Sequence, residues 1–171
     1  TEPAPISVTE NQIDVSCNGG NNGSVIFTIN GGTQTYSQNW GLNNPIALST
    51  GIANYQIIDN NGCIYTDSVI ITEPLALSTS TSNSDISCNG LTDGNISLTI
   101  NGGSPDYTIN VPPYNQTLTG GINTFITPSL LGAGTYNYSI TDSNGCVFNS
   151  SVTLIEPAPI SVTENQIDVS C

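Results

Sequence analysis

Apolar and polar residues alternate in short strings along most of this chain. Val25, Phe27 and Ile29 share one face of such a string, and Ile96, Leu98 and Ile100 repeat the pattern 71 positions later. Alternation with a period of two predicts a β-strand with one buried face. Later strings of the same kind hold Tyr55, Ile57, Tyr65, Val69 and Ile71, and then Tyr138, Ile140, Phe148, Val152 and Leu154.

Turn residues separate the predicted strands. We interpret Asn30-Gly31 and Asn101-Gly102 as hairpin dipeptides, because a type I′ turn needs positive φ at both central residues. Asn61-Gly62 and Asn144-Gly145 predict a second hairpin in each half of the chain. No segment shows a helical period with caps. The pattern therefore predicts an all-β protein, with about seven short strands per half and the rhythm of a two-sheet sandwich.

The chain contains repeats on two scales. Residues 2–17 recur without a change as residues 156–171, which indicates a longer array of 154-residue periods. Inside one period, Cys17-Asn18-Gly19 matches Cys88-Asn89-Gly90 at a shift of 71, while Glu73-Pro74 matches Glu156-Pro157 at a shift of 83. The difference places a 12-residue insertion in the second copy, within residues 104–141. We predict repeat units at residues 1–74 and 75–157, with residues 158–171 starting the next period.

Composition narrows the function classes. The chain has 13 acidic residues and no Lys, Arg or His, so its formal charge is −13. Such a surface repels nucleic acid and anionic lipid headgroups, and we expect neither as a partner. No apolar run is long enough to span a bilayer, so we expect no direct membrane insertion. Without an imidazole, an amine or a guanidinium, only carboxylate chemistry would remain, and the acids lie mostly at turns and connectors; we expect no catalytic residues.

The cysteines predict cross-links and an oxidising compartment. One cysteine lies near the start and one near the end of each unit, and we predict the disulfides Cys17–Cys63 and Cys88–Cys146, one within each unit. Cys171 would pair in the next period. The alternatives are two structural thiols per unit or a metal pair, and the absence of His and of Cys-x-x-Cys spacing argues against zinc.

Three further features are candidate sites. Asp59, Asn61, Asp93, Asp142 and Asn144 offer oxygen ligands for Ca²⁺ near turns; the alternative, which we favour, is that Asp59 and Asp142 cap their own turns. We expect no other cofactor. Trp40 could stack on a sugar, but it aligns with the apolar Val111, which favours a core position. The insertion carries a candidate ligand loop at Pro112, Pro113 and Tyr114, with an extra hairpin as the equal alternative.

The motifs together resemble a known family. Cys-Asn-Gly, the Ile-Asn-Gly-Gly turn, the string from Gly134 to Cys146 and the closing Glu-Pro are similar to the SprB repeat of giant surface adhesins in gliding Gram-negative bacteria. The resemblance implies Ig-like domains in tandem, export by the type IX secretion system and display as cell-surface filaments of the gliding machinery. It also makes Ser68, in Asp67-Ser68-Val69, an O-glycosylation candidate.

These observations lead to a structural hypothesis for function. We expect disulfide-locked spacer units of a long extracellular adhesin filament. The alternative is a carbohydrate- or calcium-binding module presented in every period. Expected partners are the neighbouring repeats of the same chain, surface or polysaccharide ligands of the full-length adhesin, and other filaments in lateral or end-to-end assembly. Because residues 156–171 supply only the opening strand of a further unit, we expect them to be poorly packed when the chain stops there.

Overall fold

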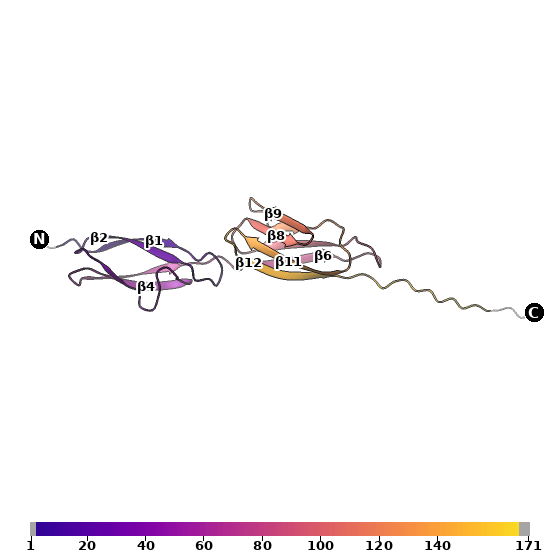
Figure 1. Ribbon diagram of the computed structural model, residues 1–171, viewed down its shortest axis with the longest axis horizontal. Helices are drawn as coiled ribbons and strands as arrows, with labels where there is room; N and C mark the ends of the chain where they lie inside the picture. Colours follow the sequence, from indigo (N-terminus) through magenta and orange to yellow (C-terminus); the bar gives the residue numbers. More distant parts are fainter. Residues whose placement is uncertain (1–2, 168–171) are drawn as a thin grey trace, which may run out of the picture.

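The computed structural model describes residues 3–167 and is all-β over that range, with no helix. Figure 1 shows two β-bodies one after the other along the long axis, followed by an extended C-terminal segment. The strands of the first body are β1 (Ser7–Ile13), β2 (Ser24–Asn30), β3 (Ser37–Asn39), β4 (Gly51–Ile58) and β5 (Ile64–Ile71). Those of the second are β6 (Ser78–Ser84), β7 (Asn95–Asn101), β8 (Tyr107–Val111), β9 (Tyr114–Leu118), β10 (Thr124–Ile126), β11 (Gly134–Asp142) and β12 (Val147–Leu154).

The first unit, as we call the body of β1–β5, has two antiparallel sheets. One contains β1 and β2, and the other has the order β3-β4-β5. Side chains from both sheets meet in one buried cluster, since Val25 of β2 and Tyr55, Ile57 and Val69 of β4 and β5 all belong to it. The predicted inward faces are confirmed: Ile57 of β4 and Ile71 of β5 are buried, whereas Ile70, on the opposite face of β5, is exposed.

The second unit, the body of β6–β12, repeats this plan with more strands. Its sheets have the orders β10-β7-β6 and β12-β11-β8-β9. Ile96, Leu98 and Ile100 are fully buried, as the alternation predicted, and pack in one cluster with Ile109 and Ile140 from the facing sheet. Apolar burial of this kind stabilises at roughly 25 cal/mol per Å², and it is the main source of stability here because the chain has no cationic side chain to form ion pairs.

The two units differ in strand number. We predicted about seven strands in each, and the described residues contain seven in the second unit but five in the first. An isolated bridge joins Gly23 to Leu48 in the first unit, and the equivalent bridge joins Gly94 to Leu131 in the second. The first partners are 71 positions apart and the second partners 83, so the insertion lies between them in the chain. The extra residues therefore build β9 and β10, whose places the first unit fills with short connections.

The Asn30-Gly31 and Asn101-Gly102 turns are not the hairpins we predicted. Each joins strands of different sheets, because β2 pairs with β1 while β3 pairs with β4. Among the described residues no non-glycine has positive φ, which excludes a type I′ turn with Asn in a central position. Gly102 has φ of 70°, and a Cβ there would overlap the carbonyl oxygen of Ala76. The glycine is required by close approach of the backbone to the segment that enters the unit. The second predicted hairpin is confirmed, because β4 pairs with β5 around Gly62, whose φ is 83°.

One seven-residue sequence occurs in two environments. Ser7–Ile13 forms strand β1, paired residue by residue with β2, and Val8 packs against the core. The identical residues 161–167 form no strand, and Ile160 and Val162 are exposed. This confirms, for residues up to 167, the expectation of a poorly packed tail.

We predict that hydrogen exchange will separate the two copies. Amides of β1 that bond to β2 should be protected by the stability of the unit, whereas the amides of residues 161–165 should exchange at close to the rate of an unfolded peptide. Mass spectrometry of overlapping fragments measures both segments in one sample. Strong protection at Ile160 and Val162 would contradict the prediction.

Candidate functional site: the joint between the units

The two units are linked by a disulfide. Cys17 of the first unit is bonded to Cys146 of the second, with a Cα–Cα distance of 5.7 Å and 129 positions between them in sequence. Cys63 and Cys88 are free and exposed. The predicted pairs Cys17–Cys63 and Cys88–Cys146 are therefore wrong: Cys17 and Cys146 are both in a disulfide, but with each other and not with the partners we predicted. The prediction for Cys171 lies outside the described residues.

Strand length explains the correction. The backbone N–H of Val15 bonds to the carbonyl of Thr72, just past the end of β5, so Cys17 lies at that end of the unit. Cys63 lies at the other end, directly before β5 begins. The eight residues of β5 span about 26 Å at 3.3 Å per residue. A disulfide needs Cα atoms within about 7 Å, so the two cysteines of one unit cannot meet.

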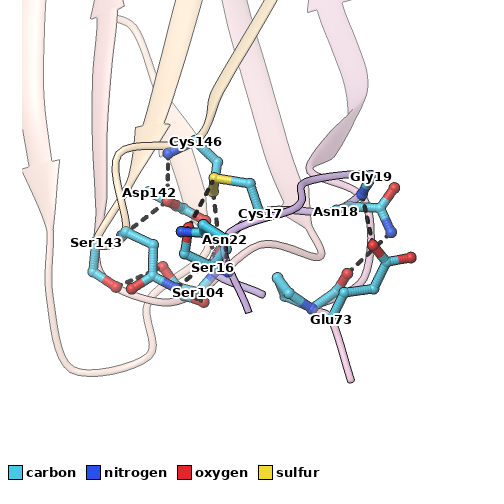
Figure 2. The surroundings of a disulfide bond; sticks show 12 residues. Ser16, Cys17, Asn18, Gly19, Asn22, Glu73, Ser104, Asp142, Ser143 and Cys146 are labelled. Atoms are coloured by element: carbon cyan, nitrogen blue, oxygen red, sulfur yellow. Dashed lines mark hydrogen bonds between the residues drawn. A yellow bond between two sulfur atoms is a disulfide. The ribbon is translucent and has the colours of Figure 1, made fainter. Parts of the chain in front are cut away.

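The first side of the joint, which we call the loop half, is the segment Ser16–Gly19 held on the connector Glu73-Pro74 (Figure 2). The Asn18 amide donates to the carbonyl of Pro74 at 3.1 Å. The backbone N–H of Gly19 donates to the Glu73 carboxylate at 2.6 Å. Proline fixes φ and the two hydrogen bonds fix the loop on it, so the position of Cys17 is tied to the direction in which the chain leaves the unit.

The other side, the turn half, is the Asp142–Cys146 turn between β11 and β12. The buried Asp142 carboxylate accepts backbone hydrogen bonds from Ser104 (2.8 Å), Asn144 (3.0 Å) and Cys146 (2.9 Å). These bonds fix the turn and orient Cys146. The Asn144 amide then donates to the carbonyl of Ser16 at 3.0 Å, which adds a hydrogen bond across the joint beside the disulfide.

The joint is thus crossed by two covalent routes. One is the peptide chain through Glu73-Pro74, and the other is the Cys17–Cys146 disulfide (Figure 2). Two attachments restrict bending and twisting in a way that a single linker cannot. The geometry suits a mechanical connection between units.

The candidate calcium ligands are used in turns. Asp59 repeats the bonding of Asp142, since its carboxylate accepts from the backbone of Thr33 (2.9 Å), Asn61 (2.9 Å) and Cys63 (2.8 Å). Asp93 accepts from the backbone and hydroxyl of Ser87. The turn-capping interpretation is confirmed for Asp59 and Asp142, and Asn144 serves the joint. Asp59 and Asp142 lie in different units, so the structure does not gather the five candidates into one site. Among residues 3–167 no group of three or more Cys, Asp or Glu side chains is arranged to hold a metal ion.

Hydrogen bonding lowers the pKa of several carboxyl groups. The main cause is a backbone N–H donor in three of them: Thr72 for Asp14, Thr33 for Asp59 and Ser68 for Asp67. In the fourth, Asp93, the main donor is the hydroxyl of Ser87. Each of these carboxyl groups is stabilised in its charged form by a donor that the fold holds in place against it.

We predict an acid-induced loss of stability. A carboxyl group whose folded pKa is depressed contributes stability above its unfolded pKa of about 3.9, and this contribution is lost as pH falls through the folded value. The thermal midpoint should therefore fall below about pH 4, even though protonation also reduces the repulsion among 13 acidic groups. Calorimetry from neutral pH to pH 2 measures it. A midpoint that keeps rising with acidity would show that charge repulsion dominates.

The remaining sequence candidates lie away from the joint. Trp40 is buried and stacks on Phe27, with ring centroids 5.3 Å apart, so its predicted core position is confirmed. Pro112 and Pro113 form the two-residue turn between β8 and β9, and Tyr114 packs partly on the core. The candidate ligand loop is thus a tight hairpin. Ser68 is exposed on β5.

Sequence reasoning missed Ser16, Asn18, Glu73 and the second role of Asn144. A signal was present in the spacing of the cysteines. Cys63 and Cys88 are 25 positions apart across the connector, and so are Cys146 and Cys171, whereas the spacing within a unit changes from 46 to 58. The distance across the connector is constant between the copies, which points to a joint rather than to the interior of a unit.

One family profile matches the chain at two stretches. The SprB repeat profile matches residues 9–40 and residues 80–123, once in each unit. The resemblance to that repeat is thereby confirmed at two stretches, although the Gly134–Cys146 string lies outside them. No curated protein sequence matches the chain.

A solved structure, that of surface layer protein SbsC, domains 1–6, aligns with 94% of this chain at 12% identity. The alignment covers 29% of the SbsC chain, and the TM-score is 0.35. A likeness at that level carries no argument about the fold or the function. The described part of the chain, residues 3–167, contains no membrane-spanning helix.

Proposed function

Since the chain carries the SprB repeat in both of its units, we propose that it is a structural, non-enzymatic piece of a long cell-surface filament. The observation that carries this proposal is the doubly connected joint: a disulfide and a proline-containing connector hold two units end to end. A joint of this kind transmits force and sets orientation. It also needs an oxidising compartment, which agrees with a place outside the cytoplasm.

We further propose that each unit is Ig-like. The strand orders support this, because β10-β7-β6 faces β9-β8-β11-β12 in the second unit, and β1-β2 faces β3-β4-β5 in the first. In an immunoglobulin-type sandwich, the second and third strands likewise belong to different sheets, and the last two strands form a hairpin. Within residues 3–167 no Cys pair joins the two sheets of a unit, so the apolar cluster holds them together.

We also propose a more specific role. The filament would be an adhesin that the gliding machinery of a Gram-negative bacterium moves and that the type IX system exports. The units here act as spacers, and a surface or polysaccharide ligand would be held by other parts of the longer protein. An all-acidic surface keeps neighbouring filaments apart at low ionic strength, so assembly along the filament axis is favoured over lateral pairing.

Electron microscopy of the full-length protein on intact cells, with antibody raised against the 171-residue chain, tests the proposal. We expect labelled fibres outside the cell, with a repeat set by pairs of units. Calorimetry with Ca²⁺ and with polysaccharides should be silent for the 171-residue chain. Labelling confined to the cytoplasm, or a compact particle instead of a fibre, would refute the structural function.

A further inference from the structure

The two free cysteines lie in copies of the two halves of the joint. Cys88 corresponds to Cys17 and lies in a loop half at the C-terminal end of the second unit. Cys63 corresponds to Cys146 and lies in a turn half at the start of the first unit.

The loop half at Cys88 is preformed. The Asn89 amide donates to the carbonyl of Pro157 at 3.2 Å, as Asn18 does to Pro74 at 3.1 Å. The backbone N–H of Gly90 donates to the Glu156 carboxylate at 2.6 Å, the same distance as from Gly19 to Glu73. The backbone N–H of Ile86 donates to the carbonyl of Ile155 at 3.0 Å, as that of Val15 does to Thr72 at the same distance. The loop therefore holds its shape with no partner unit beside it.

The turn half at Cys63 is preformed as well. Asp59 accepts the backbone N–H of Cys63 at 2.8 Å, as Asp142 accepts that of Cys146 at 2.9 Å. The Asn61 amide donates to the Thr33 hydroxyl at 2.9 Å, as the Asn144 amide does to Ser104 at 3.0 Å. In the closed joint, Asn144 makes a further bond to Ser16 of the neighbouring unit, and Asn61 is its equivalent in the turn half at Cys63.

Surface hollows mark the two unpaired halves. One is lined by Cys88, Asn89 and residues 157–160, and the other by Cys63, Asp59 and residues 3–6. In the closed joint the equivalent hollow is lined from both units, by Cys17 and Asn18 on one side and Gly145 and Cys146 on the other. Each end thus presents the surface that its counterpart would complete.

We infer that Cys88 forms a disulfide with Cys63 of the following period, so that every joint of the array is closed in the same way as the first. This inference rests on the array proposed above as the function. The partner is the next period of the same polypeptide, because residues 156–167 continue directly into the sequence that opens the first unit. The two thiols lose two protons and two electrons, which reduce a disulfide oxidant such as oxidised glutathione to two thiols.

The linkage has a mechanical consequence. Each segment from a turn-half cysteine to the next loop-half cysteine is 25 positions long, as from 63 to 88 and from 146 to 171. The disulfides would join every second one of these segments end to end, which gives two parallel covalent lines along the array. At each joint, one line would cross through the peptide chain and the other through a disulfide. The interiors of the units, such as residues 18–62 and 89–145, lie off both lines, so pulling the filament could not draw them out.

The test is a thiol count on a chain that continues the sequence for one more period, with residues 18–157 added after Cys171. Cys63 of the first period and Cys88 of the second are replaced by Ser, which leaves six cysteines. After oxidation with glutathione we expect no free thiol, and a monomer on a non-reducing gel. Digestion at acidic residues, needed because the chain has no Lys or Arg, should yield the Cys88–Cys63 peptide.

Two matched variants give the reference values. Both are made in the six-cysteine chain. C88S in the first period should leave one free thiol, at Cys63 of the second period, and C17S should leave one free thiol, at Cys146 of the first period. Two free thiols at Cys88 and Cys63, a different partner for Cys88, or disulfide-linked multimers would each overturn the inference. The count uses purified protein, so its failure would leave the cell-surface proposal standing, and microscopy on cells tests that proposal separately.

Discussion

Pulling the 171-residue chain from its two ends should extend it by only a fraction of its length. The Cys17–Cys146 disulfide takes 129 positions out of the stretched path. At about 3.5 Å per residue, the protected length is about 450 Å, and the segments outside it extend to about 150 Å in total. Optical tweezers attached through terminal peptide handles, with Cys171 replaced by Ser, measure both values.

The control is a pair of double variants. C17S/C146S should release the additional 450 Å or so, because the interior then lies on the force path. C63S/C88S removes two cysteines that form no bond in this chain and should extend like the parent. If the parent and C17S/C146S unfold to the same length, the joint is not closed by this disulfide.

Asp142→Ala should be among the most damaging single substitutions in the second unit. The buried carboxylate accepts three backbone N–H groups, and its removal leaves them without partners. With roughly 1 kcal/mol for each donor, we expect a loss of about 3 kcal/mol. That corresponds to a fall of roughly 15 °C in the midpoint for a domain of this size, measurable by calorimetry.

Asp106→Ala is the matched control. Its carboxylate is exposed and accepts one backbone hydrogen bond, from Gly120 at 3.0 Å. We expect a change below about 1 kcal/mol, since water can replace the lost acceptor. The Asp142 interpretation would be refuted if both variants melted at the same temperature as the parent.

The sequence was informative where the structure is local. Alternation identified the buried faces of β2, β4, β5 and their counterparts, because side chains on a strand point to opposite faces whatever the strand pairs with. The Asp59 and Asp142 turns could also be predicted, since an Asp side chain bonds to backbone only a few residues away.

The cysteine pairing could not be obtained in this way. Choosing Cys17–Cys63 assumed that the two cysteines of one unit lie near each other, but alternation does not say at which end of a sandwich a loop lies. That depends on the direction in which each strand runs and on the sheet it joins. The wrong hairpin predictions at Asn30 and Asn101 have the same cause, because the sequence pattern does not say that the chain crosses there from one sheet to the other.

Residues 7–13 and 161–167 separate the two kinds of information most clearly. Their shared sequence, SVTENQI, determines an alternating segment that is able to form a strand. Only the first copy becomes one, because β2 lies beside it and supplies both hydrogen-bond partners and an apolar face. The chain itself thus determines strand pattern, turn chemistry and period, while tertiary structure decides which segments pair and which cysteines meet, since an extended backbone cannot satisfy its hydrogen bonds alone.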